Sequence, residues 1–309
     1  MSTETQTSSP HQADMKFLDP LVFSRLQSLE MIAKFIVEGF MLGLHKSPYH
    51  GFSVEFSSYR KYSPGDNLRF VDWKLFGRTD RHYVKQFEEN TNLNAYLLLD
   101  KSGSMIVEDE GTGITKLRYS SCLAAALAYL MLKQRDAVGL AAFNSEGVDY
   151  IPPTAKHIQL GYILRQLEAL EATGQTDFST GLNQVASHIN RRGLIVLITD
   201  LLTEPDEILK VLKYFRYKKH EVIVFHVMTK LELELPLNEQ YEFIDAETGQ
   251  KLVTNARMVR KEYLEALEAH FDILRQGCVD YEVDYVPLRT DEALTEALVA
   301  YVSKRQQFL

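Results

Sequence analysis

LNAYLLLDKSGSM, residues 93–105, indicates both the class of fold and the place of the functional site. Its first half is a continuous apolar run that ends in Asp100, and such a run is typical of a strand buried on both faces of a parallel sheet. A second run of this kind, LIVLITD at residues 194–200, ends in Asp200. The two runs predict two buried strands, each with a carboxylate at its carboxyl end.

Beyond these two runs, extended and helical patterns alternate along the chain. Further strands are expected at residues 137–143, 147–151, 221–227 and 282–288, and helices at about residues 20–44, 116–134, 155–171, 178–191, 204–218 and 255–276, with a closing helix after them. This alternation predicts an α/β fold of Rossmann type, a doubly wound, mostly parallel six-stranded sheet covered on both faces. In the common strand order, the strands that end in Asp100 and Asp200 are neighbours, with tips about 5 Å apart.

The chain divides into three regions. Residues 1–14 are polar and rich in Ser and Thr, which indicates a disordered tail. Residues 15–91 combine a helix with short alternating stretches, which predict a small β-rich N-terminal subdomain. Residues 92–309 form the α/β domain, with a hairpin inserted at about residues 240–253. This hairpin could stand alone or join the strands of residues 51–87, and because isolated hairpins are only marginally stable we favour joining.

Composition places the chain among ordinary globular proteins. Of its 309 residues, 45% are hydrophobic and 25% are charged, which excludes a wholly disordered or fibrous chain. The net charge of −8 argues against a nucleic-acid-binding protein. The most apolar stretch, residues 35–44, is about half as long as a membrane span, and the N-terminus lacks a secretory pattern, so we expect a cytoplasmic protein without a membrane span. Cys122, Cys278 and His226 are expected in the core.

Carboxylate and hydroxyl oxygens gather around the two strand tips. Ser102 and Ser104 follow the first aspartate, and Thr176 lies just before another expected helix. Such an all-oxygen set suits a hard cation, Mg²⁺ or Mn²⁺, and its members are Asp100, Ser102, Ser104, Thr176 and Asp200. Because hydroxyls carry no charge, a divalent ion held there still seeks an anionic ligand, such as an Asp or Glu of a partner. The alternative, in which each aspartate only caps a helix or turn, stays open.

This set resembles a known metal site. DKSGSM at residues 100–105, Thr176 and Asp200 are similar to the metal-ion-dependent adhesion site of von Willebrand factor A domains, where a D-x-S-x-S loop, a Thr and an Asp surround Mg²⁺ or Mn²⁺. Two further stretches, EFSSYRKYSPGDNLRFVDWKLFGRTDRHYVKQF and FIDAETGQKLV, resemble the bacterial DUF58 family, a domain of unknown function built around such a core. The resemblance spans about residues 16–306. Gln175 departs from the pattern, since relatives often have Gly there.

The resemblance implies a non-enzymatic, metal-dependent protein-binding module. Relatives in the family often accompany MoxR-type AAA+ ATPases, so it implies an adaptor or assembly factor that meets such an ATPase through a Mg²⁺-bridged carboxylate. The alternative is a Mg²⁺-dependent hydrolase or phosphotransferase that uses Asp100 as its nucleophile. Against this alternative, position 102 is Ser, where phosphatases of the haloacid-dehalogenase type need a second Asp.

Residues 45–87 are more basic than the rest of the chain. They hold eight Lys and Arg against four acidic residues, a local charge of +4 that leaves −12 elsewhere. We favour pairing within the segment, because charges a few residues apart in a tight fold usually pair. The alternative is a surface for an acidic partner or for nucleic acid, whose candidate residues are Arg60, Arg69, Arg78 and Arg81.

Overall fold

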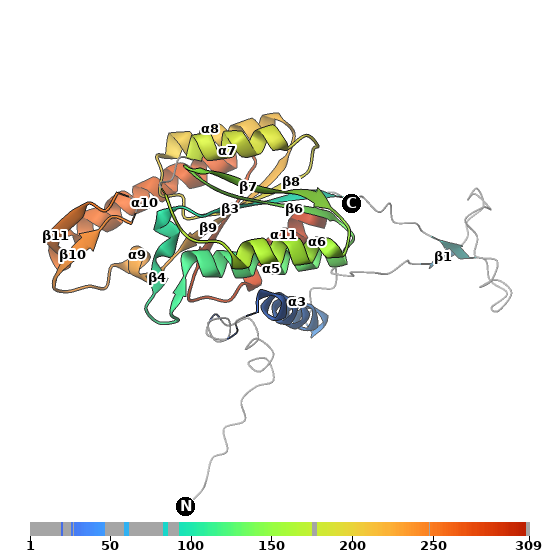
Figure 1. Cartoon of the computed structure of the whole chain (residues 1–309), viewed down its shortest axis with the longest axis horizontal. Coiled ribbons are helices and arrows are strands. Elements are labelled where there is room, and N and C mark those ends of the chain that lie inside the picture. The colour runs from blue at the N-terminus through green and yellow to red at the C-terminus, as the bar shows by residue number, and fades with distance from the viewer. Residues whose placement is uncertain are drawn as a thin grey trace, which may run out of the picture.

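The computed structural model of the chain describes residues 20, 26, 28–46, 59–61, 83–85, 93–174, 178–246 and 248–306. A central six-stranded sheet lies between two layers of helices (Figure 1). Its strands, in the order in which they lie side by side, are β12 (Asp284–Arg289), β9 (Glu221–Met228), β8 (Leu194–Thr199), β3 (Asn94–Asp100), β6 (Ala137–Asn144) and β7 (Gly147–Thr154). Every neighbouring pair is parallel except β6 and β7. The expected doubly wound, mostly parallel sheet is confirmed.

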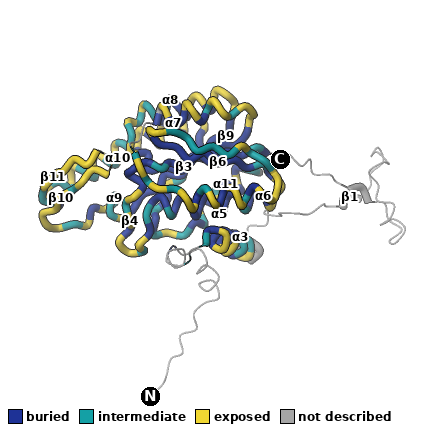
Figure 2. The backbone as a smooth tube through the Cα atoms, viewed as in Figure 1, coloured by how far each residue is buried: buried dark blue, intermediate teal, exposed yellow. Residues whose placement is uncertain are grey.

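The inner strands owe their position to uninterrupted apolar sequence. Every residue of β8 is buried, and Figure 2 shows the middle of the sheet as the most buried part of the molecule. Side chains alternate between the two faces of a strand, so Val196 joins the core on one face and Leu197 the core on the other. The edge strand β7 is only half-buried and contains Pro152 and Pro153, as an edge position permits.

The helices form two layers, one for each core. On one side, α7 (Phe178–His188), α8 (Pro205–Tyr217) and α10 (Ala256–Asp280) cover the sheet. On the other side lie α5 (Lys116–Lys133), α6 (Ile158–Glu168) and α11 (Thr295–Gln306), with α3 (Leu29–Lys46) packed against α5. The expected core positions of Cys122, Cys278 and His226 are confirmed, since all three are buried. No described helix is long and apolar enough to span a membrane.

The helix expected over about residues 20–44 is interrupted: residue 20 is helical, residues 26 and 28 are not, and α3 begins at Leu29. Ser28 explains this start, because its carbonyl accepts from the Ile32 amide at 3.1 Å and its hydroxyl from the Met31 amide at 3.5 Å. A serine in that position satisfies amides that the first turn of a helix leaves without a partner. The apolar pattern therefore predicted the helix over residues 29–44 correctly, and the prediction of one continuous helix from residue 20 is wrong.

Short elements complete the structure: the 3₁₀ turn η3 (Gly103–Ile106), the strand pair β4 (Glu108–Asp109) and β5 (Ile114–Thr115), and helix α9 (Lys230–Glu234). The inserted hairpin is present as β10 (Gln240–Ile244) and β11 (Lys251–Asn255). Among the described strands, these two pair only with each other, and β1 (Tyr59–Lys61) likewise pairs with β2 (Tyr83–Lys85). The expectation that the hairpin joins the strands of residues 51–87 is wrong for the described strands. The hairpin has its own support, including an ion pair between Lys251 and Glu242.

Gly193 allows β8 to lie directly beside β3. A Cβ atom at this position would lie 2.0 Å from the backbone oxygen of Asn94. We therefore predict that Gly193→Ala lowers the free energy of unfolding by about 1–3 kcal/mol, measured by urea denaturation. The matched control is Gly161→Ala in α6, where the new methyl group meets nothing within 4 Å and should leave stability unchanged or raised by about 0.5–1 kcal/mol. Equal stability of the two variants would contradict this packing argument.

Candidate metal-binding site

The two strand tips lie side by side, as the strand order predicted. In the parallel pairing of β3 with β8, Leu99 is opposite Ile198, so the next residues, Asp100 and Thr199, are also adjacent. The Thr199 hydroxyl donates a hydrogen bond of 2.7 Å to Oδ2 of Asp100. Asp100, Thr199 and Asp200 are each 0% exposed. Two buried carboxylates thus lie side by side at the carboxyl-terminal ends of two central strands.

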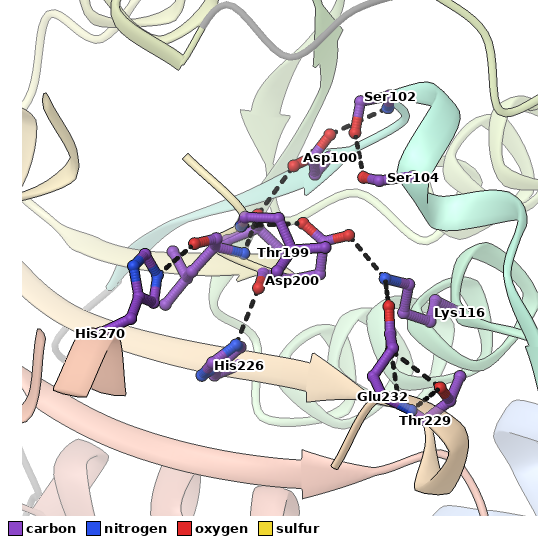
Figure 3. Close-up of polar contacts among 12 residues, drawn as sticks. Asp100, Ser102, Ser104, Lys116, Thr199, Asp200, His226, Thr229, Glu232 and His270 are labelled. Carbon is purple, nitrogen blue, oxygen red and sulfur yellow. Dashed lines mark hydrogen bonds and ion pairs between the residues drawn. The ribbon is translucent and has the colours of Figure 1, made fainter. Parts of the chain in front are cut away.

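The loop after β3 folds its oxygens toward Asp100. The backbone amide of Ser102 donates to Oδ1 of Asp100 at 2.9 Å, which closes a tight turn. The Ser102 and Ser104 hydroxyl oxygens lie 3.0 Å apart, and both residues are buried. Figure 3 shows Ser102 and Ser104 beside the Asp100 carboxylate. The D-x-S-x-S segment therefore presents three oxygen-bearing side chains together.

Two other segments touch this loop at Gly103. Its amide donates to the Gly174 carbonyl at 3.0 Å. A Cβ atom at Gly103 would lie 3.0 Å from that same oxygen and 2.8 Å from the carbonyl oxygen of Ala246, in the turn of the β10–β11 hairpin. The segment before α7 and the inserted hairpin therefore both reach the metal-site loop. Thr176, two residues after Gly174, lies outside the described residues.

A lysine that the sequence pattern does not indicate lies within the site. Lys116 is the first residue of α5, and its side chain is 0% exposed. Its ammonium nitrogen lies 2.7 Å from Oδ2 of Asp200 and 2.6 Å from Oε1 of Glu232 (Figure 3). The other oxygen of Glu232, Oε2, accepts from the backbone amide and the hydroxyl of Thr229, both at 2.8 Å. The buried ammonium group of Lys116 thus links the tip of β8 to helix α9.

Burial and charge move the pKa values of these groups in different directions. Burial, and then the charge of Asp200, raise the pKa of Asp100 to about 6, although hydrogen bonds from Ser102 and Thr199 oppose the rise. Burial also disfavours ionised Asp200, but the adjacent Lys116 ammonium outweighs it and lowers the pKa of Asp200. Burial acts against charged Lys116 too, and its two carboxylate partners raise its pKa overall. At neutral pH both aspartates and the lysine are therefore charged.

Two histidines hold the turn after β8. Nε2 of His226 donates to the Asp200 carbonyl at 2.8 Å, and its Nδ1 accepts from the Tyr285 hydroxyl. Nε2 of His270, from α10, donates to the carbonyl of Leu201 at 2.9 Å. Leu201 has a φ of 52°, in the left-handed region that residues other than glycine seldom adopt, so the turn needs such support. These contacts fix the backbone from which the Asp200 carboxylate extends.

The structure brings together four of the five expected metal ligands, Asp100, Ser102, Ser104 and Asp200. The basic candidates of the sequence are Arg60, Arg69, Arg78 and Arg81. The structure does not describe their side chains, and it describes the backbone of Arg60 alone, in β1. The sequence motif does not predict that Lys116 and Glu232 belong to the site. The pattern Thr229-x-x-Glu232 is a capping box that could have located α9. The residues next to Lys116 in the sequence do not indicate that its side chain points into the protein.

The donor set fits a hard cation. Among the described residues, no group of three or more His, Cys, Asp or Glu side chains is placed to hold a metal ion. Two carboxylates and two hydroxyls instead form an oxygen site of the kind that Mg²⁺ or Mn²⁺ occupies while it keeps several waters. The hydrogen bond from the Ser102 amide to Asp100 fixes the first turn of the loop that carries the two serines.

Comparison with known proteins assigns the chain to a family. The family model described as "Protein of unknown function DUF58" matches residues 58–272. The chain belongs to the DUF58 family. It is similar to the uncharacterized protein Rv1480 of Mycobacterium tuberculosis, with 26% identity over 297 residues that cover 94% of this chain and 91% of the relative. The protein YeaD of Bacillus subtilis is 32% identical over 90 residues, 29% of this chain and 20% of that protein.

This DUF58 protein is also similar to solved structures. The conserved hypothetical protein BatB from Bacteroides thetaiotaomicron has a TM-score of 0.48 and 17% identity, over 70% of this chain and 99% of that one. The VWA domain of SpRpn10 has a TM-score of 0.41 and 13% identity, over 67% and 94% of the two chains. The family match confirms the expected DUF58 membership, and the strand order of the sheet itself confirms the fold.

The buried histidine behind Asp200 makes stability depend on pH. Burial lowers the pKa of His226 to about 4, so the folded chain keeps this ring neutral while the unfolded chain takes up a proton near pH 6.5. The unfolded state binds more protons between these values, and stability therefore falls as the pH falls from about 6.5 to 4. The unfolding free energy of the parent protein should fall between pH 7 and pH 5. We predict that this fall is smaller by about 2 kcal/mol in His226→Gln.

Urea denaturation at the two pH values measures this difference. The control variant is His157→Gln, which replaces an exposed histidine and should retain the pH dependence of the parent protein. An unchanged pH dependence in His226→Gln would show that His226 is not the neutral, buried group described above.

Proposed function

We propose that this DUF58 protein is a non-enzymatic, metal-dependent protein-binding module. The observation that supports this function is the meeting of buried carboxylate and hydroxyl oxygens at the tips of β3 and β8. Mg²⁺ or Mn²⁺ would be held there by Asp100, Ser102, Ser104, Asp200 and, as the resemblance implies, Thr176. When bound, such an ion offers a position for a carboxylate of another protein.

The hydrogen bonds around the site support binding more than catalysis. A hydrolase needs a side chain that accepts a proton beside the reacting group. Both histidines near Asp200 use Nε2 to hold a backbone carbonyl, His226 that of Asp200 and His270 that of Leu201. Lys116 is fully buried between two carboxylates and has a raised pKa, which makes it a poor base. These groups act as supports for the strand tip.

A cavity beside the site provides surface for the rest of a partner. It has a volume of about 300 Å³ and lies between the loop after β8 and helix α10. Its wall includes Leu202, Pro205, Tyr263, Leu267 and His270. Leu202 is 46% exposed and lies two residues from Asp200. A protein segment that places an acidic side chain on the ion would therefore have an apolar surface next to it.

We further propose an adaptor or assembly role with a MoxR-type AAA+ ATPase in the cytoplasm. This part rests on the family resemblance, since relatives often accompany such ATPases. Affinity capture with the full chain, in Mg²⁺ and in chelator, tests it directly. Retention of an AAA+ ATPase only with Mg²⁺ would support the role, and metal-independent retention that Asp100→Ala leaves unchanged would contradict it.

The metal site itself is tested by titration with Mg²⁺ or Mn²⁺. Isothermal calorimetry should detect one divalent ion per chain, and Asp100→Ala should weaken its binding by about tenfold or more, because it removes a charged ligand. The matched control is Asp280→Asn at the exposed C-terminal end of α10, which should leave the affinity unchanged. Absence of binding by the parent protein at millimolar metal would rule out the proposed function.

A further inference from the structure

We infer that Lys116 sets the charge of the metal site, so that a bound divalent cation remains under-neutralised and depends on a partner's carboxylate for tight binding. This inference rests on the proposed function, because it concerns the same ion. It goes beyond that function by assigning to one residue the dependence of metal binding on the partner. The assignment rests on the position of the lysine, its two contacts and the charges around it.

The position of Lys116 is unfavourable by itself. The residue begins α5 directly after the N-cap Thr115, where the partial positive charge of the helix end repels an ammonium group. Its complete burial adds a desolvation cost, and buried ion pairs of this kind are often no more stabilising than apolar side chains of equal size. Stability alone therefore does not account for a lysine in this place. Such violations of local preference are expected at functional sites.

The contacts of Lys116 compensate the charge of Asp200 but not that of Asp100. Its ammonium group binds Oδ2 of Asp200 and offsets that charge. The other oxygen of Asp200, Oδ1, accepts from the Leu202 amide at 3.3 Å, and the carboxylate also receives a hydrogen bond from Ser104. Asp100 receives hydrogen bonds but has no described ion-pair partner. An ion among these oxygens would therefore have one uncompensated carboxylate among its ligands. Counting only the two aspartates and Lys116, it would retain a net charge of about +1.

Glu232 moderates the effect of the lysine. It accepts from Lys116 through Oε1, while its capping box with Thr229 and a hydrogen bond of 2.8 Å from Tyr263 to its carbonyl hold it in place. Without the charge of Glu232, the ammonium group would repel the ion more strongly. Without Lys116, both Asp200 and Glu232 would attract it. Substitutions at these two residues should therefore change metal affinity in opposite directions.

The experiment measures Mn²⁺ binding to the full-length chain at pH 7.5, with MnCl₂ alone and with added sodium acetate as a model carboxylate. We expect Lys116→Met to bind Mn²⁺ about tenfold more tightly and Glu232→Gln about tenfold more weakly than the parent protein. Acetate should increase the Mn²⁺ affinity of the parent protein, and this increase should be lost in Lys116→Met, because Asp200 then supplies the missing charge.

Two further variants keep the result interpretable. The double variant Lys116→Met with Glu232→Gln removes the buried pair together, so it serves if the single lysine variant does not fold. It should bind Mn²⁺ about tenfold more tightly than Glu232→Gln alone, because these two variants differ only at Lys116. Lys304→Met is the control, because Lys304 likewise bridges two carboxylates, those of Glu221 and Asp284, at the opposite edge of the sheet. Its Mn²⁺ affinity should match that of the parent protein.

The outcomes separate the two proposals. If the parent protein binds no Mn²⁺, the proposed function fails and this inference fails with it. If the parent protein binds Mn²⁺ but the Lys116 and Glu232 variants do not shift the affinity in opposite directions, the inference is overturned and the metal site stands. A shift in Lys304→Met equal to that in Lys116→Met would also overturn it, because total charge would then explain the effect.

Discussion

Two like charges buried at neighbouring strand tips are the constraint on which this structure depends. The pairing of β3 with β8 places Asp100 and Asp200 at the same edge of the sheet, and both are withdrawn from water. Burial of carboxylates is costly unless positive charge or hydrogen bonds compensate for it. Lys116 compensates Asp200, whereas Asp100 has only neutral donors from Ser102 and Thr199. This asymmetry leaves a place for one more positive charge, and we assign that place to a divalent ion.

The surrounding structure holds this arrangement rigid. The buried strands provide a fixed base, and the histidines of β9 and α10 secure the turn after Asp200. The hairpin turn and the segment before α7 both lie against Gly103, so both limit the space that the D-x-S-x-S loop can occupy. Preorganised oxygens lower the ordering cost of binding an ion, which is the physical advantage of building a site on strand ends.

The sequence predicted most of the fold because the signals were local. Continuous apolar runs such as LIVLIT identify strands buried on both faces, and their order along the chain implies that Asp100 and Asp200 are neighbours. The Lys116–Asp200 pair escaped prediction because it joins residues 84 positions apart, and a lysine at a helix start normally faces solvent. The sequence also did not predict that the hairpin forms a sheet of its own, because the residues of a short strand do not indicate which other strand it pairs with. Thr176 and the side chains of the basic segment lie outside the described residues, so their roles remain predictions.

The most direct test of a metal at these strand tips is anomalous X-ray scattering from crystals of the full chain soaked in MnCl₂, with data collected at the manganese absorption edge. The account predicts one anomalous peak within coordination distance of the Ser102 and Ser104 hydroxyl oxygens, on the side of Asp200 away from Lys116. A map with no peak there, in crystals that hold the described positions of Asp100 and Asp200, would contradict it.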